Sequence, residues 1–335
     1  MNAPRTTRVL AGSFVALLGA AAPARAQTTL QDLDNADQQL AYGVFDDHSL
    51  NLPIDGKRPA AARGGQYLAF AGCTANSSGA CSAHPVLLRD SQYGNTYNIS
   101  VTTSNSPVDG LGPHVTTFRS TNVSTGVVTD EVFVAFYSAS ALTSDAISGL
   151  NQVYVRHLTL VNGALQSATT ALVSRPGDFS TSDCVTSDAA NAMDLYAGSS
   201  ADIAVTVGYS CYLQSNGSSH VFVKTLHYSG AGAPTELART QADLDPATGS
   251  APYASVNPSL IVHAQSGIWQ RDVHVGFEAQ ASALAPRRVW LRRIDRDDYA
   301  TGSVVNLCPQ GVGGCLHPAV TQRGLGVYAA FTQNS

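Results

Sequence analysis

The chain has 335 residues, of which 24 are acidic and 19 are basic, and its formal net charge is −5. A mildly acidic chain without a strongly basic segment does not suit a phosphate backbone, which excludes nucleic acid as an expected partner.

The first 26 residues have the pattern of a secretory signal peptide. Arg5 and Arg8 precede the apolar run "VLAGSFVALLGAAAPA", and Ala24-Arg25-Ala26 fits an A-x-A cleavage pattern. The rest of the chain has no apolar run of about 18 to 20 residues, so we expect no transmembrane segment. The sequence predicts a periplasmic or secreted protein with one mature domain, residues 27–335.

Residues 28–50 contain a strand-like stretch, "QLAYGVF", followed by "FDDHS". Asp46 and Asp47 form a carboxylate pair near the end of this stretch. A glycosidase needs two carboxyl groups that converge on one bond, so this pair is the candidate for catalysis. The alternative is a solvated turn rich in aspartate.

Four later strands share a pattern in which apolar residues lead to a basic residue. They are "PVLLRDS", "QVYVRHL", "HVFVKTL" and "RVWLRRI", with Arg89, Arg156, Lys224 and Arg292 at separations of 67, 68 and 68. Because each copy has a basic residue at the same place, we expect a structural role rather than catalysis, which normally breaks the symmetry of a repeat.

Two further landmarks keep the same register. A small residue followed by an aromatic residue closes an earlier strand of each unit, at Ala69-Phe70, Ala135-Phe136, Gly208-Tyr209, Gly276-Phe277 and Ala330-Phe331. A proline or a cysteine opens each unit, at Pro59, Pro113, Cys184, Pro258 and Pro318. We expect each proline to be the first residue of a strand, where its missing N–H interrupts no ladder.

A period near 68 residues with about four strands per unit is typical of an all-β fold, the β-propeller. The predicted units are 52–108, 109–178, 179–252, 253–312 and 313–335. The last unit is too short, and residues 28–50 could complete it, because a closed ring leaves no unpaired edge. The sequence therefore predicts five blades of four antiparallel strands, closed by the N-terminal segment.

The best copy of the repeat, "VFVAFYSASALTSDAISGLNQVYVRHL", resembles the repeats of bacterial TolB-like, PD40-type β-propellers. In that family an "AF-x-S" strand leads through a polar loop to a "VYVRDL"-like strand. The tryptophan and the Ser-Pro-Asp-Gly turn of the family are missing from every unit here. The resemblance implies the fold and export, and it brings no catalytic residues or partner.

Six cysteines in an exported chain predict disulfides. Proximity in the sequence pairs Cys73 with Cys81, Cys184 with Cys211 and Cys308 with Cys315, among 15 arithmetically possible connectivities. None of these spacings is that of a zinc site.

Two segments begin with the Asp-x-Asp pattern of some calcium loops, at Asp32 and Asp34 and at Asp243 and Asp245. Neither has the glycine and the terminal glutamate of an EF-hand loop. The sequence predicts no cofactor and no metal, with calcium at these aspartates as the open alternative.

No catalytic motif stands out, so the favoured function is non-enzymatic. We expect an exported propeller that binds a protein, a peptide or a glycan through the loops of one rim. The alternative is a secreted hydrolase of the glycoside hydrolase type, with carboxylates in the central channel.

Overall fold

The structure is a computed structural model. It describes residues 60–62, 65–72, 74–75, 81–174, 184–199, 202–213, 217–230, 232–245, 249–264, 271–295, 301–308, 314–323 and 326–334. The named elements in these ranges are all β-strands. No helix in this part of the chain is long and apolar enough to cross a membrane.

The first two sheets each contain four antiparallel strands. Blade 1 has the order β1-β2-β5-β6 and blade 2 has the order β10-β9-β8-β7. The bounds in blade 1 are β1 (Ala60–Ala62), β2 (Tyr67–Ala71), β5 (Val86–Asp90) and β6 (Asn95–Asn98), and the hairpin β3 (Thr74–Ala75) and β4 (Cys81–Ala83) lies between β2 and β5. The bounds in blade 2 are β7 (Leu111–Thr121), β8 (Val128–Ser138), β9 (Gln152–Val161) and β10 (Ala164–Leu172).

Two more sheets of the same kind follow, with a two-stranded sheet after them. Blade 3 consists of β11 (Cys184–Ser199), β12 (Asp202–Leu213), β13 (Ser218–Tyr228) and β14 (Thr235–Gln241). Blade 4 consists of β15 (Ala254–Ala264), β16 (Arg271–Gln280), β17 (Arg288–Asp295) and β18 (Thr301–Asn306). The fifth sheet pairs β19 (Gly314–Arg323) with β20 (Gly326–Asn334).

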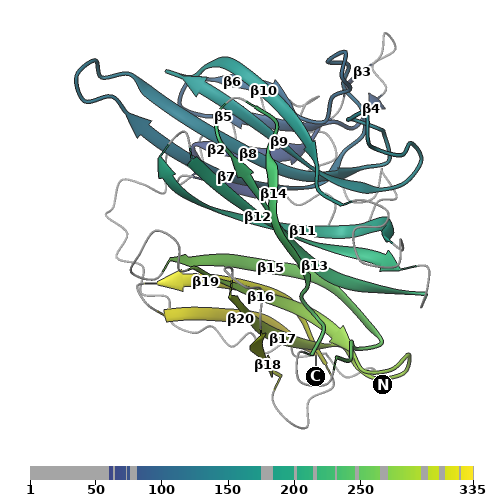
Figure 1. Ribbon diagram of the computed structural model, residues 1–335. Helices are drawn as coiled ribbons and strands as arrows, with labels where there is room; N and C mark the ends of the chain where they lie inside the picture. The colour runs from purple at the N-terminus through teal and green to yellow at the C-terminus, as the bar shows by residue number, and fades with distance from the viewer. Residues whose placement is uncertain are drawn as a thin grey trace, which may run out of the picture.

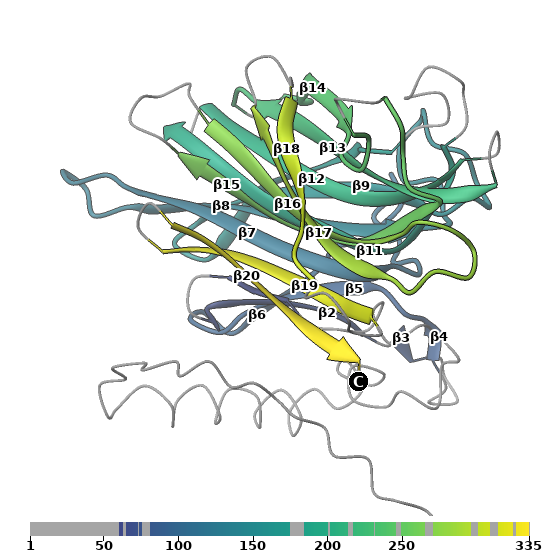
Figure 2. The same cartoon turned by 90° about the horizontal axis from the view of Figure 1, so that it is seen from below.

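Consecutive sheets pack against each other through their first strands. The first strands β1, β7, β11, β15 and β19 contact one another in that order, and each of the later ones also contacts the second strand of the preceding sheet. The sheets follow one another through the molecule in chain order (Figures 1 and 2). Four-stranded antiparallel sheets that pack in this way form a β-propeller. The predicted fold class and four of the predicted blades are confirmed.

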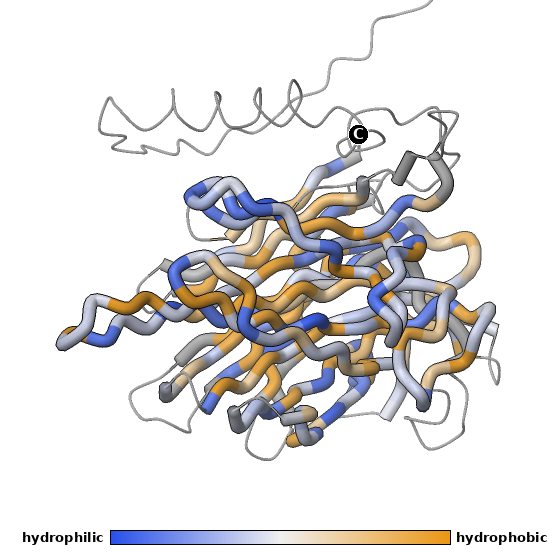
Figure 3. The backbone as a smooth tube through the Cα atoms, turned by 90° about the horizontal axis from the view of Figure 1, so that it is seen from above, coloured by the Kyte–Doolittle hydropathy of each residue, from blue (hydrophilic) through white to orange (hydrophobic). Residues whose placement is uncertain are grey.

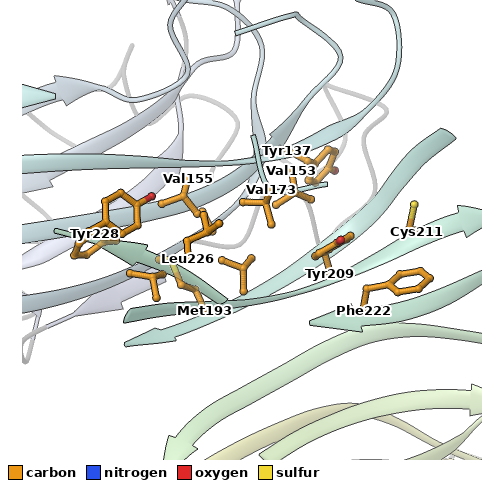
Figure 4. Packing of buried hydrophobic residues seen from close by; sticks show 14 of the residues in the cluster. Tyr137, Val153, Val155, Val173, Met193, Tyr209, Cys211, Phe222, Leu226 and Tyr228 are labelled. Carbon is orange, nitrogen blue, oxygen red and sulfur yellow. The ribbon is translucent and has the colours of Figure 1, made fainter. Parts of the chain in front are cut away.

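The central sheets bury both faces. Val153 and Val155 of β9 belong to the apolar cluster between blades 2 and 3, whereas Tyr154 belongs to the cluster between blades 1 and 2. Figure 4 shows the first of these clusters, with Val155 on one side and Leu226 on the other. Apolar residues run along the strands through the interior (Figure 3). The alternation of side chains along a strand therefore serves both neighbouring blades.

The small-aromatic landmark is a packing device between blades. In blade 4 the aromatic Phe277 faces blade 3, and Gly276 faces the fifth sheet. A Cβ added at Gly276 would lie 2.7 Å from the Cγ2 of Val320 and 3.3 Å from the Cβ of Pro318. The small residue thus makes room for the first strand of the next blade, next to its proline.

The prediction that each proline begins a strand is wrong for the three of these prolines that the structure describes, and it is untested for Pro59, which lies outside the described residues. Pro113, Pro258 and Pro318 lie inside β7, β15 and β19, at positions where the strand register shifts. The residues before them, Gly112, Asn257 and His317, have φ values of 58°, 54° and 55°. A β-bulge leaves one residue out of the ladder, so it also accommodates a proline without N–H.

The repeated basic residues make local contacts, as expected of a structural role. Arg89 donates to Thr96 Oγ1 at 2.9 Å and Arg156 donates to Thr170 Oγ1 at 2.8 Å, in both cases across to the fourth strand. Lys224 lies 3.4 Å from Glu236, also on the fourth strand of its blade. Arg292 differs, because it reaches back to carbonyl groups of blade 3.

One of the three predicted disulfides is confirmed. Cys308 and Cys315 are bonded to each other, with 6.0 Å between their Cα atoms. Cys211 is also disulfide-bonded, whereas the side chain of its predicted partner Cys184 lies outside the described part. Cys73 and the side chain of Cys81 lie outside it too, so these pairings stay predictions.

Candidate functional site

A pocket of about 220 Å³ lies between blades 1 and 2. Its wall comes from the segment before β5, the segment before β7, the end of β8 and the loop that leads into β9. The lining residues are His84, Asp109, Gly110, Leu111, Tyr137, Ser138, Ala139 and Asn151. The pocket therefore lies at the end of blade 2 where its first strand begins.

Glycine is required at position 110 to bring the two blades together here. A Cβ at Gly110 would lie 2.7 Å from the Cβ of Ser100 and 2.9 Å from its Oγ. The backbone N–H of Gly110 donates to the carbonyl of His84 at 3.0 Å. This close approach fixes the backbone of Asp109, whose carbonyl also accepts a bond from the Ser138 hydroxyl.

The Asp109 carboxylate is held in place but remains open to solvent. Its Oδ1 accepts a hydrogen bond of 2.6 Å from the backbone N–H of His84. The side chain of Asp109 is 71% exposed, whereas that of His84 is 22% exposed. The nearer imidazole nitrogen of His84 lies 3.8 Å from the carboxylate. The arrangement offers a fixed acceptor to a ligand in the pocket.

The other imidazole nitrogen of His84 is buried and has no hydrogen-bond partner among the described residues. A buried polar atom without a partner is uncommon and is usually satisfied by water or a ligand. This nitrogen and the Asp109 carboxylate are two polar groups that lie close together although their residues are 25 positions apart in the sequence.

The loop that forms the far wall is anchored to its own blade. The Tyr154 hydroxyl donates to the carbonyl of Ser140 at 2.9 Å. The Gln152 side chain accepts from the backbone N–H of Ile147 at 2.7 Å, and Gly149 donates to Ala139 at 2.8 Å. These bonds hold the loop at residues 139–151 in one shape, so Asn151 keeps its position beside the pocket.

Neither of the described aspartates singled out in the sequence, Asp243 and Asp245, lines this pocket. Asp46 and Asp47, like Asp32 and Asp34, lie outside the described residues, so the catalytic prediction is untested. The calcium prediction also stays open.

Two other predicted calcium ligands lie in blade 3, next to β14. Asp243 is buried, and its two oxygens accept bonds from His220 and Gln241. Asp245 closes a turn with Gly249 through backbone bonds. No group of three acidic, histidine or cysteine residues in the described ranges could hold a metal ion.

Sequence reasoning missed His84 and Asp109, because neither lies in a recognisable motif. They are 25 residues apart, and they meet because the segment between β6 and β7 returns along the start of β5, where the backbone N–H of Gly110 donates to the carbonyl of His84. One signal was present, namely a histidine directly before Pro85 and a glycine directly after Asp109. Both are typical of segments where the backbone turns or approaches another segment closely.

No known family model matches the chain, and neither does any curated protein. Among solved structures, it is similar to an exo-1,5-α-L-arabinanase from a bovine ruminal metagenomic library, with 12% identity, a TM-score of 0.37, and coverage of 83% of this chain and 88% of that one. It is also similar to an exo-β-1,3-galactanase from Clostridium thermocellum, with 11% identity, a TM-score of 0.36 and coverage of 86% and 56%.

A third similar structure is named only as a glycoside hydrolase, with 7% identity, a TM-score of 0.32 and coverage of 84% and 88%. At identities this low and TM-scores below 0.5, these likenesses carry no argument about activity. None of the three is named as a TolB-like protein, so that resemblance stays a prediction.

Proposed function

We propose that the protein is an exported β-propeller that binds a neutral carbohydrate in the pocket between blades 1 and 2. The observation that carries the proposal is the chemistry of the lining. It combines a carboxylate, an imidazole, an amide and hydroxyl groups with the apolar side chains of Leu111 and Ala139. Convergent polar groups in a partly apolar pocket are typical of small-molecule sites.

The charge of the lining residues and the volume of the pocket both restrict the kind of ligand. The lining residues that the structure describes include no lysine or arginine, and the exposed carboxylate of Asp109 would repel an anionic ligand. A volume of about 220 Å³ is smaller than the roughly 300 to 1,000 Å³ of a drug-sized ligand site. A single sugar ring, rich in hydroxyl groups and uncharged, suits both properties better than a peptide does.

The binding test uses calorimetric titration of the mature protein with a panel of neutral and anionic sugars. We expect a neutral sugar to bind, and Asp109→Ala to weaken its binding by about 10-fold to 100-fold. A hydrogen bond to a charged group contributes about 1.5 to 3 kcal/mol, which corresponds to that range.

The matched control is Asp145→Ala, which removes an exposed carboxylate from the loop at 139–151 without touching the pocket lining. It should leave the affinity unchanged. A preference for anionic sugars, or an affinity that is insensitive to Asp109→Ala, would reject the pocket as the binding site.

A second candidate is hydrolysis of a glycoside in the same pocket, and the exposed carboxylate of Asp109 favours it. Such hydrolysis needs two carboxyl groups about 5 to 10 Å apart, one on each side of the glycosidic bond. Asp109 is the only carboxylate among the described lining residues. The second would come from a segment such as the one that carries Asp46 and Asp47.

The release of reducing ends from a polysaccharide panel separates the two candidates. Turnover that disappears in Asp109→Asn and in the double variant Asp46→Asn with Asp47→Asn would favour a hydrolase. Sugar binding without turnover in the wild-type protein would favour the binding function.

Export by the signal peptide at residues 1–26 and closure of the ring by residues 28–50 belong to the same proposal. Among the described residues, β20 pairs along one edge only, with β19. Phe70 and Leu87 are buried and form a separate cluster from the one between blades 1 and 2. Burial on this other face of blade 1 supports a fifth blade packed against it.

A further inference from the structure

A hydrogen-bonded Ser-His-Asp chain lies in blade 3, away from the pocket lining. The Ser218 hydroxyl oxygen is 3.0 Å from His220 Nε2, and His220 Nδ1 is 2.7 Å from Asp243 Oδ2. All three residues are largely buried, at 7%, 1% and 3% exposure. The connectivity is that of a serine hydrolase triad, in which the serine contacts Nε2 and the carboxylate contacts Nδ1.

The strands place these three side chains together. Ser218 and His220 are two residues apart on β13, so both point to the same face of the sheet. In the antiparallel pairing of β13 with β14, Phe222 lies opposite Gln241. Continued by two residues, this register brings His220 opposite Asp243.

Blade 3 departs from the other blades at this position. In the others, a small residue after the fourth strand accepts a hydrogen bond from the first apolar residue of the third strand. Ser100 accepts from Val86 at 2.8 Å, Ser174 accepts from Val153 at 2.7 Å, and Cys308 accepts from Val289 at 3.1 Å.

Asp243 takes the corresponding place in blade 3. The backbone N–H of the preceding residue, Ala242, donates to the carbonyl of Val221, and in blade 2 the N–H of Val173 donates in the same way to the carbonyl of Val153. Instead of a small residue, blade 3 has a carboxylate directed at a histidine. A site of chemistry is expected to break the symmetry of a repeat in this way, whereas a packing device repeats in every blade.

Other groups fix Asp243 in place. Gln241 donates to its second oxygen at 2.9 Å. Arg292 of blade 4 donates to the carbonyl groups of Gln241, Ala242 and Leu244 at 2.6 to 3.0 Å. Burial lowers the pKa of Arg292, and the carboxylate of Asp243 opposes that effect. Arg292 is therefore a positioning residue for this segment.

The direction of the hydrogen bonds follows from the carboxylate. An ionised carboxylate only accepts, so Nδ1 of His220 donates to Asp243. In neutral imidazole the other nitrogen, Nε2, is then an acceptor, and the Ser218 hydroxyl donates to it. This is the tautomer that lets a histidine remove a proton from a serine.

We propose that Ser218 is a nucleophile for acyl transfer, with His220 as its general base and Asp243 as the group that orients His220. The substrate class is a carboxylic ester. This proposal does not depend on carbohydrate binding in the pocket between blades 1 and 2.

The reaction balances with water as the only co-reactant. The Ser218 oxygen bonds to the carbonyl carbon while its proton passes to His220 Nε2. The C–O bond of the ester then breaks, and the leaving alcohol takes that proton. Water attacks the acyl-serine with His220 again as base, which releases the carboxylic acid and restores the hydroxyl group.

The test uses an alkyl fluorophosphonate, which reacts with an activated serine when a P–O bond forms and fluoride leaves. We expect the full mature protein to gain one adduct, located on Ser218 by peptide mass spectrometry. Ser218→Ala should abolish it. His220→Gln and Asp243→Asn should slow labelling by about 10²-fold to 10⁴-fold, the usual contribution of a general base.

The matched control is Ser219→Ala, whose side chain lies on the opposite face of β13 and which should label at the wild-type rate. Thermal unfolding of each variant separates slow labelling from loss of the fold. If the wild-type protein gains no adduct on Ser218, the proposal is wrong, and no variant is needed to show it. Labelling of Asp243→Asn at the wild-type rate would overturn the role of Asp243.

Discussion

Replacing Asp130 by asparagine is expected to lower the free energy of unfolding by about 3 kcal/mol. Asp130 is 1% exposed and joins blades 1 and 2. It accepts two hydrogen bonds of 2.6 Å from Arg119 and one of 2.7 Å from the Tyr67 hydroxyl. Removing one partner of a buried ion pair typically costs about 3 to 5 kcal/mol.

The lower end of that range applies because Arg119 keeps 21% of its side chain in contact with solvent. Its hydrogen bonds to Asp130 raise the pKa of Arg119, and burial raises the pKa of Tyr67, so at neutral pH Arg119 is charged and Tyr67 is a donor. Asparagine keeps the shape of the side chain but leaves the guanidinium without a counter-charge.

Urea denaturation followed by circular dichroism measures this loss. The matched control is Arg239→Ala, which breaks the exposed pair between Arg239 and Glu236. An exposed pair contributes about 0 to 1 kcal/mol. If Asp130→Asn costs no more than this control does, the contact between blades 1 and 2 does not depend on the buried pair.

Gly276→Val is expected to destabilise the protein by about 3 kcal/mol through overpacking. The added side chain would meet Val320 and Pro318 on the first strand of the fifth sheet, with the Cβ alone 2.7 Å from Val320 Cγ2. The carbonyl oxygen of Ser259 would also be in van der Waals contact with this Cβ, at 3.8 Å. The two sheets would therefore have to separate.

Gly232→Val is the control, because a Cβ at Gly232 would meet no atom within 4 Å. Its free energy of unfolding should stay within about 0.5 kcal/mol of the wild-type value, as is usual for a surface change. Equal stability of the two variants would show that Gly276 is not at a tight contact between β16 and β19.

These two sites illustrate what the sequence can predict. The small-aromatic pairs predicted the blade register. Each blade needs a small residue where the next blade packs against it and a large residue that packs against the preceding blade. The role of the prolines was misjudged, since a bulge and an extended strand start look alike in sequence. Only the register shifts around Pro113, Pro258 and Pro318 distinguish them.

The candidate sites were harder to predict, for a physical reason. His84 meets Asp109 through the return of the segment between β6 and β7 along the start of β5, and His220 meets Asp243 through the pairing of β13 with β14. Neither pair has a spacing in the sequence that its chemistry requires. Only the hydrogen bonds that follow the fourth strand of each blade make Asp243 equivalent to Ser100, Ser174 and Cys308.

The most direct test of the carbohydrate proposal is a crystal structure of the mature protein with a neutral sugar that binds in solution. We expect the sugar between His84, Asp109 and Asn151, with a ring hydroxyl group within hydrogen-bonding distance of the Asp109 carboxylate. A sugar bound elsewhere, with this pocket empty, would contradict it.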